Sequence, residues 1–274
     1  MSRRYTSLLA VLKKKSRFIK YAFACLIVAI VLYLFGTTAP EINAALSVTP
    51  RYTFPLPRDV KHVIIDIGLY NNIIRPRAGE FVIAVDASLK EIEANKLSTM
   101  CSTTNCILLN AAIGKGPGPF VDLHQSERPG GSSHITNFDP NVWPMELRPA
   151  VVPLISLKTI IDAVPKEIPI VLCKLDTNGN DVYVINSAET SLKRCSRIVM
   201  EIVGPQDGTG PPDQYERAIE ITKKLGFRLD PRYLSAKRQS GSYDLYFERP
   251  EARNQPDTSD LYHDPSTFVP LSSD

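Results

Sequence analysis

The chain has 274 residues, of which 43% are hydrophobic and 22% are charged. This length allows one domain or two small ones, and we expect one domain with a single well-buried core. The formal net charge of +3 overstates the basicity of the folded part, because seven Lys and Arg residues precede the first acid, Glu41. Composition and charge therefore give no support to nucleic-acid binding.

An apolar run follows this basic segment. Residues 21–35 read YAFACLIVAIVLYLF, and flanking apolar residues extend the run toward the roughly 17–25 residues that a membrane-spanning helix needs. We expect a basic cytoplasmic segment at 1–17 and a transmembrane anchor at 18–36. The excess of Lys and Arg before the anchor predicts a single-pass type II protein with its domain in the lumen of the endoplasmic reticulum or Golgi. A cleaved signal peptide and a mitochondrial presequence are the alternatives.

Prolines and polar residues set the expected limits of the domain. Prolines at positions 50, 55 and 57 push the residues before them out of helical conformation, which predicts an extended stem over 37–59. Residues 250–274 are rich in Pro, Asp and Ser and poor in apolar residues, which predicts a disordered tail. The folded domain is therefore expected at 60–249.

Between these limits, apolar strands alternate with helical segments. Two helix starts carry capping signals, the box Ser88-Leu-Lys-Glu91 and Ser156. The predicted strands are 62–68, 81–86, 106–112, 170–176 and 197–203, the predicted helices are 88–97, 157–164, 181–192 and 215–225, and a last pair of strands follows at 227–234 and 243–248. Parallel strands joined by crossover helices form a doubly wound, three-layer α/β sheet, and the last pair predicts an antiparallel hairpin at its edge.

Several of these strands end in polar residues. The first ends in Asp66 and Gly68, the second in Asp86, and the fourth in Lys174 and Asp176. Carboxyl ends of parallel strands meet at one edge of the sheet, where ligands bind; there a glycine permits a sharp turn and a carboxylate can accept both hydroxyls of a ribose. The alternatives are a tight turn without a ligand at Gly68, a plain helix cap for Asp86, and a surface ion pair for Lys174 and Asp176.

Other chemistries find no support in the sequence. It contains no HExxH, Walker or Gly-x-Ser-x-Gly motif, and its four His residues are scattered, so neither a metal site nor a serine hydrolase is expected. A nicotinamide dehydrogenase would need Gly-x-Gly-x-x-Gly after the first strand, where this chain has DIGLYNN. Cys101 and Cys106 are close enough in sequence to bridge if the domain is lumenal, whereas we expect Cys173 and Cys195 to stay free.

Five segments in order resemble the FkbM family of S-adenosylmethionine-dependent methyltransferases. They are VIIDIG with an acid after the next strand, NAAIG, PLISLKTIID, LCKLDTNGND and IVMEI. The resemblance spans about residues 60–248, and KLDTNGND, similar to the family's Lys-Ile-Asp-x-Glu-Gly-x-Glu, carries most of it. It implies a Rossmann-like methyltransferase sheet, S-adenosylmethionine as cofactor, and methyl transfer to a hydroxyl of an unidentified sugar, lipid or small-molecule acceptor.

The resemblance also implies roles for individual residues. Those expected near the cofactor are Asp66, Gly68, Tyr70, Asn72, Asp86, Asn110 and Ala111. Asp176 is the candidate base for the acceptor's proton, with Lys174 orienting it or stabilising charge. His134, in the Ser-rich segment 129–139, is the alternative base. For Asn110, hydrogen bonding to a local turn is an equal alternative, and for His134 an idle place in a surface loop is another.

The chain departs from the family's pattern in the first turn and the helix that follows it, and at position 178. Tyr70 stands where the family has Asn and Asn72 where it has a second Gly, and Asn178 replaces a Glu. The connection 72–80, which should carry a helix, is short and contains Pro76. These departures favour an alternative function, a catalytically inactive membrane-tethered binding module that retains the methyltransferase fold.

Overall fold

The computed structural model describes residues 53–69, 73–116, 118–126, 133–134, 147–202, 214–230 and 243–258. The expected cytoplasmic segment, the anchor at 18–36 and most of the stem lie outside these residues. Within them, none of the helices combines the length and apolar character that crossing a bilayer requires. The described elements belong to one compact unit, Tyr52–Asp274.

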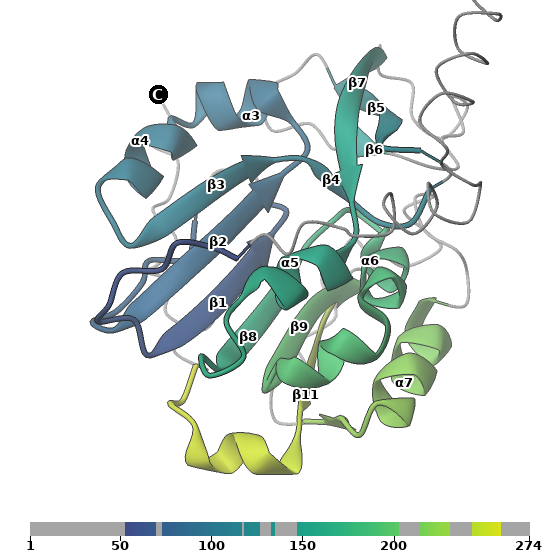
Figure 1. The fold of residues 1–274 in the computed structure, drawn as a ribbon. Helices are drawn as coiled ribbons and strands as arrows, with labels where there is room; N and C mark the ends of the chain where they lie inside the picture. The colour runs from purple at the N-terminus through teal and green to yellow at the C-terminus, as the bar shows by residue number, and fades with distance from the viewer. Residues whose placement is uncertain are drawn as a thin grey trace, which may run out of the picture. The chain divides into compact units, whose positions relative to one another are not determined.

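Seven strands of the described part form the main sheet, in the order β10-β11-β9-β8-β1-β2-β3 (Figure 1). Their bounds are β1 His62–Ile67, β2 Glu80–Asp86, β3 Cys106–Asn110, β8 Ile170–Leu175, β9 Arg197–Ile202, β10 Arg228–Leu229 and β11 Tyr243–Glu248. The first five are parallel, while β11 runs antiparallel to both β9 and β10. The predicted, mostly parallel sheet with an antiparallel edge hairpin is confirmed. The strand order reverses between β1 and β8, which makes their carboxyl ends a topological switch point.

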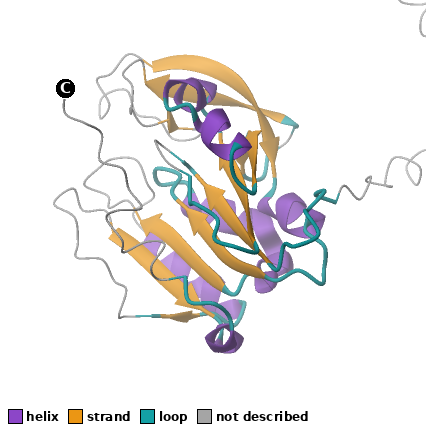
Figure 2. Cartoon of the chain, turned by 90° about the vertical axis from the view of Figure 1, so that its left-hand side faces the viewer, coloured by secondary structure: helices purple, strands orange, loops and turns teal. Residues whose placement is uncertain are grey.

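Helices cover both faces of this sheet, as expected for three layers (Figure 2). One face carries α3 (Leu89–Ala94) and α4 (Leu97–Ser102), and the other α5 (Leu157–Ala163), α6 (Asp181–Ala188), the 3-10 helix η1 (Glu189–Arg194) and α7 (Gln214–Lys224). Alternate strand residues feed two separate cores: Ile64 packs with α3 and α4, and Ile65 with the second group of helices. The predicted caps are confirmed. Ser88 Oγ accepts a hydrogen bond from the amide of Glu91, and Ser156 Oγ accepts one from the amide of Thr159.

A second, smaller sheet follows β3 and was not expected from the sequence. It contains β4 (Ala112–Ile113), β5 (Phe120–Ser126), β6 (Ser133–His134) and β7 (Leu147–Ile155) in the order β4-β7-β5-β6. Ala112, Leu123 and Val152 form its core. Prolines 149 and 153 inside β7 concealed this strand, since proline within an apolar run argues against strand.

The connection from β1 to β2 contains no helix in its described residues, 73–79. Ile73 is 4% exposed and fills the core that a crossover helix would otherwise cover. The amide of Ile74 donates to Asp66 Oδ2 at 2.9 Å, which fixes the connection to the end of β1. The expectation was a shortened helix, and the described part of the connection contains none.

Both cysteine pairs of the domain are bridged. Cys101–Cys106 closes a short loop, as the sequence allowed. The expectation that Cys173 and Cys195 stay free is wrong, because they form a disulfide with Cα atoms 6.3 Å apart. Cys195 precedes β9 and pairs with Ile170, only three residues from Cys173 along β8, so the two cysteines are near neighbours.

The domain is longer at both ends than predicted. Residues 250–258, expected to be disordered, include the 3-10 helix η4 (Pro250–Asn254) and a segment held by side chains at the amino ends of the strands. Arg197 donates to the carbonyls of Ala252 and Pro256, and Arg77 to that of Asp257. At the amino end, the last part of the expected stem belongs to the domain, because the amide of Phe54 donates to the carbonyl of Ala163 in α5.

Candidate functional site

The carboxyl ends of β1, β2, β3 and β8 bring most of the predicted site residues to one edge of the sheet. Asp66 lies opposite Lys174 in the register of β1 and β8. Asp86 lies opposite Asn110 in the register of β2 and β3. We call this edge, from Asn110 across to Asp176, the carboxyl edge.

Gly68 makes the close approach of two strand ends possible. Its φ is +77°, and a Cβ at this position would lie 1.8 Å from the carbonyl oxygen of Asp176. The amides of both residues are hydrogen-bonded: that of Gly68 donates to the carbonyl of Val85 and that of Asp176 to the carbonyl of Ile67, both at 2.9 Å. Only glycine fits here, and the neighbouring backbone alone accounts for that requirement.

Lys174 ties β1 to β8 at this point. Its Nζ lies 2.5 Å from the carbonyl oxygen of Gly68, 3.3 Å from Asp66 Oδ1 and 3.6 Å from Asp176 Oδ2. Burial acts to lower the pKa of Lys174, but the carboxylates of Asp66 and Asp176 outweigh it and raise the pKa above its usual value. The lysine is therefore a permanent cation that orients Asp176, and it cannot serve as a base.

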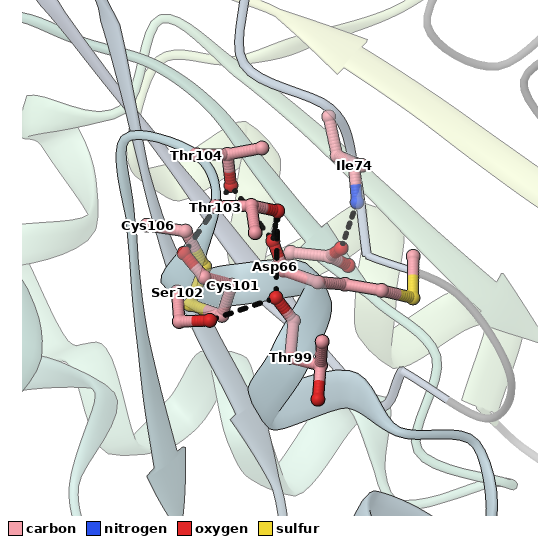
Figure 3. Close-up of a disulfide and its surroundings, with 9 residues drawn as sticks. Asp66, Ile74, Thr99, Cys101, Ser102, Thr103, Thr104 and Cys106 are labelled. Atoms are coloured by element: carbon pink, nitrogen blue, oxygen red, sulfur yellow. Dashed lines mark hydrogen bonds between the residues drawn. A yellow bond between two sulfur atoms is a disulfide. The ribbon is translucent and has the colours of Figure 1, made fainter.

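Asp66 is buried, with 1% of its surface exposed. Its carboxylate accepts the amide of Ile74 (Figure 3), and it also faces Lys174. Burial raises the pKa of Asp66, and Lys174 and the Ile74 amide oppose that rise. In this structure Asp66 holds the β1–β2 connection and the lysine in place, while its predicted contact with a cofactor stays a prediction.

Asp86 and Asn110 lock the ends of β2 and β3 together. The carboxylate of Asp86 accepts the amides of Leu69 at 2.9 Å and Ser88 at 2.7 Å, and its backbone carbonyl accepts Asn110 Nδ2 and the amide of Ala111, both at 3.0 Å. Asp86 thus holds the turn before α3, whose cap is Ser88, and Asn110 bonds to that distant turn rather than to a local one. The contact of Asp86 with a ribose stays a prediction.

The sequence reasoning gave no role to Asp181, which lies at the start of α6. It is fully buried, and its Oδ2 accepts Thr177 Oγ1 at 3.0 Å and the Thr177 amide at 3.3 Å. Burial, followed by the charge of Asp176, raises the pKa of Asp181 to about 7. The sequence offered one signal for this contact, because Asp181 lies in the first turn of a predicted helix and four residues after Thr177, within reach of its side chain.

The turn between Asp176 and α6 explains one departure from the family's pattern. Asn178 has a φ of +49° and Gly179 a φ of +86°. Asparagine tolerates this left-handed conformation better than a glutamate would, so the turn geometry is sufficient reason for Asn178.

Leu89 was also missed. It is the first residue of α3, three positions after Asp86, and half of its surface is exposed although it is apolar. An exposed leucine beside the carboxyl edge suits the flat face of a nucleobase.

For three predicted residues the structure describes little or nothing. Tyr70 and Asn72 lie outside the described residues. The backbone of His134 belongs to β6 and pairs with His124 in the smaller sheet, but the position of its side chain is not described. No cluster of three or more His, Cys, Asp or Glu within the described ranges could hold a metal ion.

A pocket of about 260 Å³ is lined in part by Ile74, whose amide donates to Asp66. Residues of the β1–β2 connection and the end of α4 line it, namely Ile73, Ile74, Arg75, Pro76, Met100, Thr103 and Thr104. The hydroxyls of Thr103 and Thr104 donate to carbonyls of α4, next to the Cys101–Cys106 disulfide (Figure 3). The pocket is smaller than the roughly 300–1,000 Å³ of typical ligand sites, and we assign it no role.

Comparison with known proteins gives similarity at the level of structure. No protein-family model matches the chain, and neither does any curated protein. A candidate methyltransferase from Streptococcus mutans in complex with SAH is 13% identical, covers 69% of this chain and 89% of its own, and has a TM-score of 0.36. An rRNA methylase from Streptococcus thermophilus is 11% identical over 70% of this chain and 87% of its own, with a TM-score of 0.37.

A third solved structure, a TehB-like SAM-dependent methyltransferase from Corynebacterium glutamicum, is 12% identical over 84% of this chain and 98% of its own, with a TM-score of 0.34. The structural neighbours are thus methyltransferases with a mostly parallel α/β sheet, at low identity. At these TM-scores the likeness carries no argument about activity, which depends on the residues of the carboxyl edge.

Proposed function

We propose that the chain is an S-adenosylmethionine-dependent O-methyltransferase that acts on a hydroxyl of a sugar, lipid or small-molecule acceptor. The observation that carries this proposal is the carboxyl edge, where the Gly68 turn lies at a topological switch point between acids on β1, β2 and β8. The chemistry of this edge suits a cofactor with a ribose diol and a positively charged sulfonium. Asp86 and Leu89 would hold the nucleoside, and the neighbouring acids would favour the cation.

The cofactor, when bound, supplies an electrophilic methyl group. The chain's own residues then have two tasks, to align the acceptor's oxygen and to remove its proton. Asp176 suits the second task, because its side chain is 42% exposed at the carboxyl edge and one of its oxygens faces Lys174. The hydroxyl proton passes to the Asp176 carboxylate, and Lys174 holds that carboxylate toward the acceptor without taking part in proton transfer.

The second candidate function is a binding module without turnover. The observation in its favour is the burial of Asp66, whose carboxylate faces Ile74 and Lys174 rather than the open edge. A chain that has lost catalysis can keep such a pair, because it stabilises the fold. This candidate predicts ligand binding without methyl transfer.

We further propose that the domain is lumenal and tethered to the membrane by residues 18–36. The apolar run and the basic residues before it support the tether. The two disulfides support an oxidising compartment such as the endoplasmic reticulum or Golgi, because cytosolic thiols are kept reduced. A mitochondrial location is the alternative.

Calorimetric titration of residues 52–274 with S-adenosylmethionine tests the cofactor assignment. Asp86→Ala should weaken binding about 10- to 100-fold, since a hydrogen bond to a charged group contributes roughly 1.5–3 kcal/mol. Asp122→Ala, which removes an exposed acid from β5, is the matched control and should bind like the wild type. Absence of binding by the wild type would refute the cofactor, and equal binding by the folded Asp86→Ala variant would refute the ribose contact.

Transfer of labelled methyl groups into lipid, sugar and small-molecule extracts tests the catalytic assignment. Asp176→Asn should lower turnover by roughly 10²–10⁴-fold, as is typical for loss of a general base, and leave cofactor affinity nearly unchanged. Loss of cofactor binding with an intact fold would move Asp176 to the cofactor site. Cofactor binding by the wild type without transfer to any extract would favour the binding module.

A further inference from the structure

Large apolar side chains are exposed at four positions of the described chain: Leu89, Phe120, Val151 and Tyr183. Leu89 adjoins the carboxyl edge, and the ring of Tyr183 lies under the guanidinium of Arg217. The other two are the most exposed, Phe120 at 61% and Val151 at 71%, and both lie in the smaller sheet. Neither belongs to the site proposed above.

Phe120 and Val151 are neighbours on one face of that sheet. Phe120 lies opposite Pro153, and Val151 lies opposite Asp122, so the two apolar side chains are diagonal cross-strand neighbours. Because side chains alternate along a strand, Leu123 and Val152 point to the buried side of the sheet and Phe120 and Val151 to the other.

Two prolines extend this surface. Pro149 and Pro153 alternate with Val151 along β7, and both are exposed. We call the surface formed by Phe120, Pro149, Val151 and Pro153 the apolar face. Asp122 and His124 lie on the same side of β5, opposite Val151 and Pro149, so they border the apolar face along β5.

The length of chain before the domain indicates what covers this face. The expected anchor ends at residue 36, and the described structure begins at Thr53. The intervening residues, 37–52, reach at most about 55 Å when fully extended. A domain on so short a tether meets the bilayer at a high effective concentration, so even a small apolar surface would remain in contact with lipid.

A second copy of the chain is a poorer occupant. A stable protein interface involves roughly 20–30 residues on each side, whereas the apolar face has four. Contact with a bilayer has no such minimum, because each apolar side chain contributes by itself to partition into the interface.

We propose that the apolar face is a lipid-contacting surface that lies on the bilayer to which the chain is tethered. This inference rests on the proposed membrane tether and is independent of the proposed methyl transfer. The smaller sheet begins at Ala112, directly after Asn110 and Ala111 at the carboxyl edge, so the contact would orient the domain relative to the bilayer close to that edge.

Photo-crosslinking in the full chain tests the proposal. The full chain is reconstituted in phosphatidylcholine vesicles with Phe120→p-benzoylphenylalanine, and Tyr183→p-benzoylphenylalanine is the matched control at an exposed aromatic position outside the face. We expect at least about tenfold more lipid adduct from position 120 than from position 183. Adding Val151→Asp to the first variant should reduce its lipid adduct at least about threefold, because a charge at the centre of the face opposes contact with acyl chains.

Three other outcomes overturn the proposal. Equal lipid adducts at positions 120 and 183 would remove the specificity, and chain-to-chain adducts at position 120 would assign the face to a second copy. Release of the full chain from vesicles by an alkaline wash would remove the tether itself. Titration of the same preparation with S-adenosylmethionine separates the two proposals, because cofactor binding without lipid adducts rejects the apolar face alone, and lipid adducts without cofactor binding reject the cofactor alone.

Discussion

Asp181 makes the stability of the domain depend on pH in a direction that can be calculated. Its pKa rises from 3.8 to about 7 on folding because the side chain is buried. A folded-state pKa above the unfolded value means that the folded protein binds the proton more tightly. The stabilisation by the neutral carboxyl is therefore complete below about pH 3.8 and is lost as the pH rises through about 7.

The magnitude follows from the same two values. Each pH unit between them is worth about 1.4 kcal/mol, so between pH 5 and pH 8 the wild type should lose about 2–3 kcal/mol through this group. Asp181→Asn keeps an oxygen that can accept from Thr177 and cannot titrate. The difference in unfolding free energy between the two proteins should then change by that amount, in favour of the variant at the higher pH.

Urea unfolding of residues 52–274 at pH 5 and pH 8 measures this difference. Asp66 also has a raised pKa and gives the wild type a trend of the same sign, but it is present in both proteins and cancels in the comparison. Parallel pH profiles for wild type and variant would refute the reasoning, since they would mean that Asp181 is ionised in the fold at pH 5.

Two further predictions concern the backbone at the carboxyl edge and the disulfides. Gly68→Ala should destabilise the domain severely, because its Cβ would overlap the Asp176 carbonyl. Gly226→Ala is the control, since Gly226 is also at positive φ but has nothing within 4 Å of the added Cβ, and it should cost only about 1 kcal/mol. Thermal unfolding compares the two variants, and equal losses of stability would contradict the close approach at Gly68. Replacing the Cys173–Cys195 pair by serines should cost about 3 kcal/mol and the Cys101–Cys106 pair about 2 kcal/mol, because the longer loop loses more chain entropy on closure; a reversed order in urea unfolding would contradict this loop-length argument.

The main sheet could be predicted because its strands are continuous apolar runs that end in polar residues. β1, β2, β8 and β9 are buried on both faces, and this is the pattern that parallel strands require. The capping serines could be predicted equally well, since Ser88 and Ser156 each precede a helical apolar pattern. These features depend on local sequence, which is why they could be read in advance.

The smaller sheet, the second disulfide and the C-terminal segment depend on distant residues. β7 pairs with β5 across a long separation and contains prolines that argue locally against strand. The Cys173–Cys195 bridge follows from the stagger between β8 and β9, which the sequence does not specify. Residues 250–258 look disordered by composition, but Arg77 and Arg197, far earlier in the chain, help to hold them.

For the candidate site, the sequence predicted where the residues lie in the fold better than it predicted their hydrogen bonds. The strand ends identified Asp66, Asp86, Lys174 and Asp176, and the structure brings them to one edge. The bond from the Leu69 amide to Asp86 could not be foreseen, because the direction of that amide depends on the Gly68 turn. Burial of Asp181 likewise depends on packing around α6 rather than on its sequence neighbours.

The pairing of β1 with β8 also has a consequence for how the chain folds. Lys174 reaches Gly68 across 106 positions of sequence, so this contact closes a very long loop. Loops of this kind close late and slow the folding reaction, because their entropy must be lost before the contact forms. The two halves of the carboxyl edge therefore come together only when the centre of the sheet is complete, and ligand capture during refolding should report the last stage of folding rather than its first.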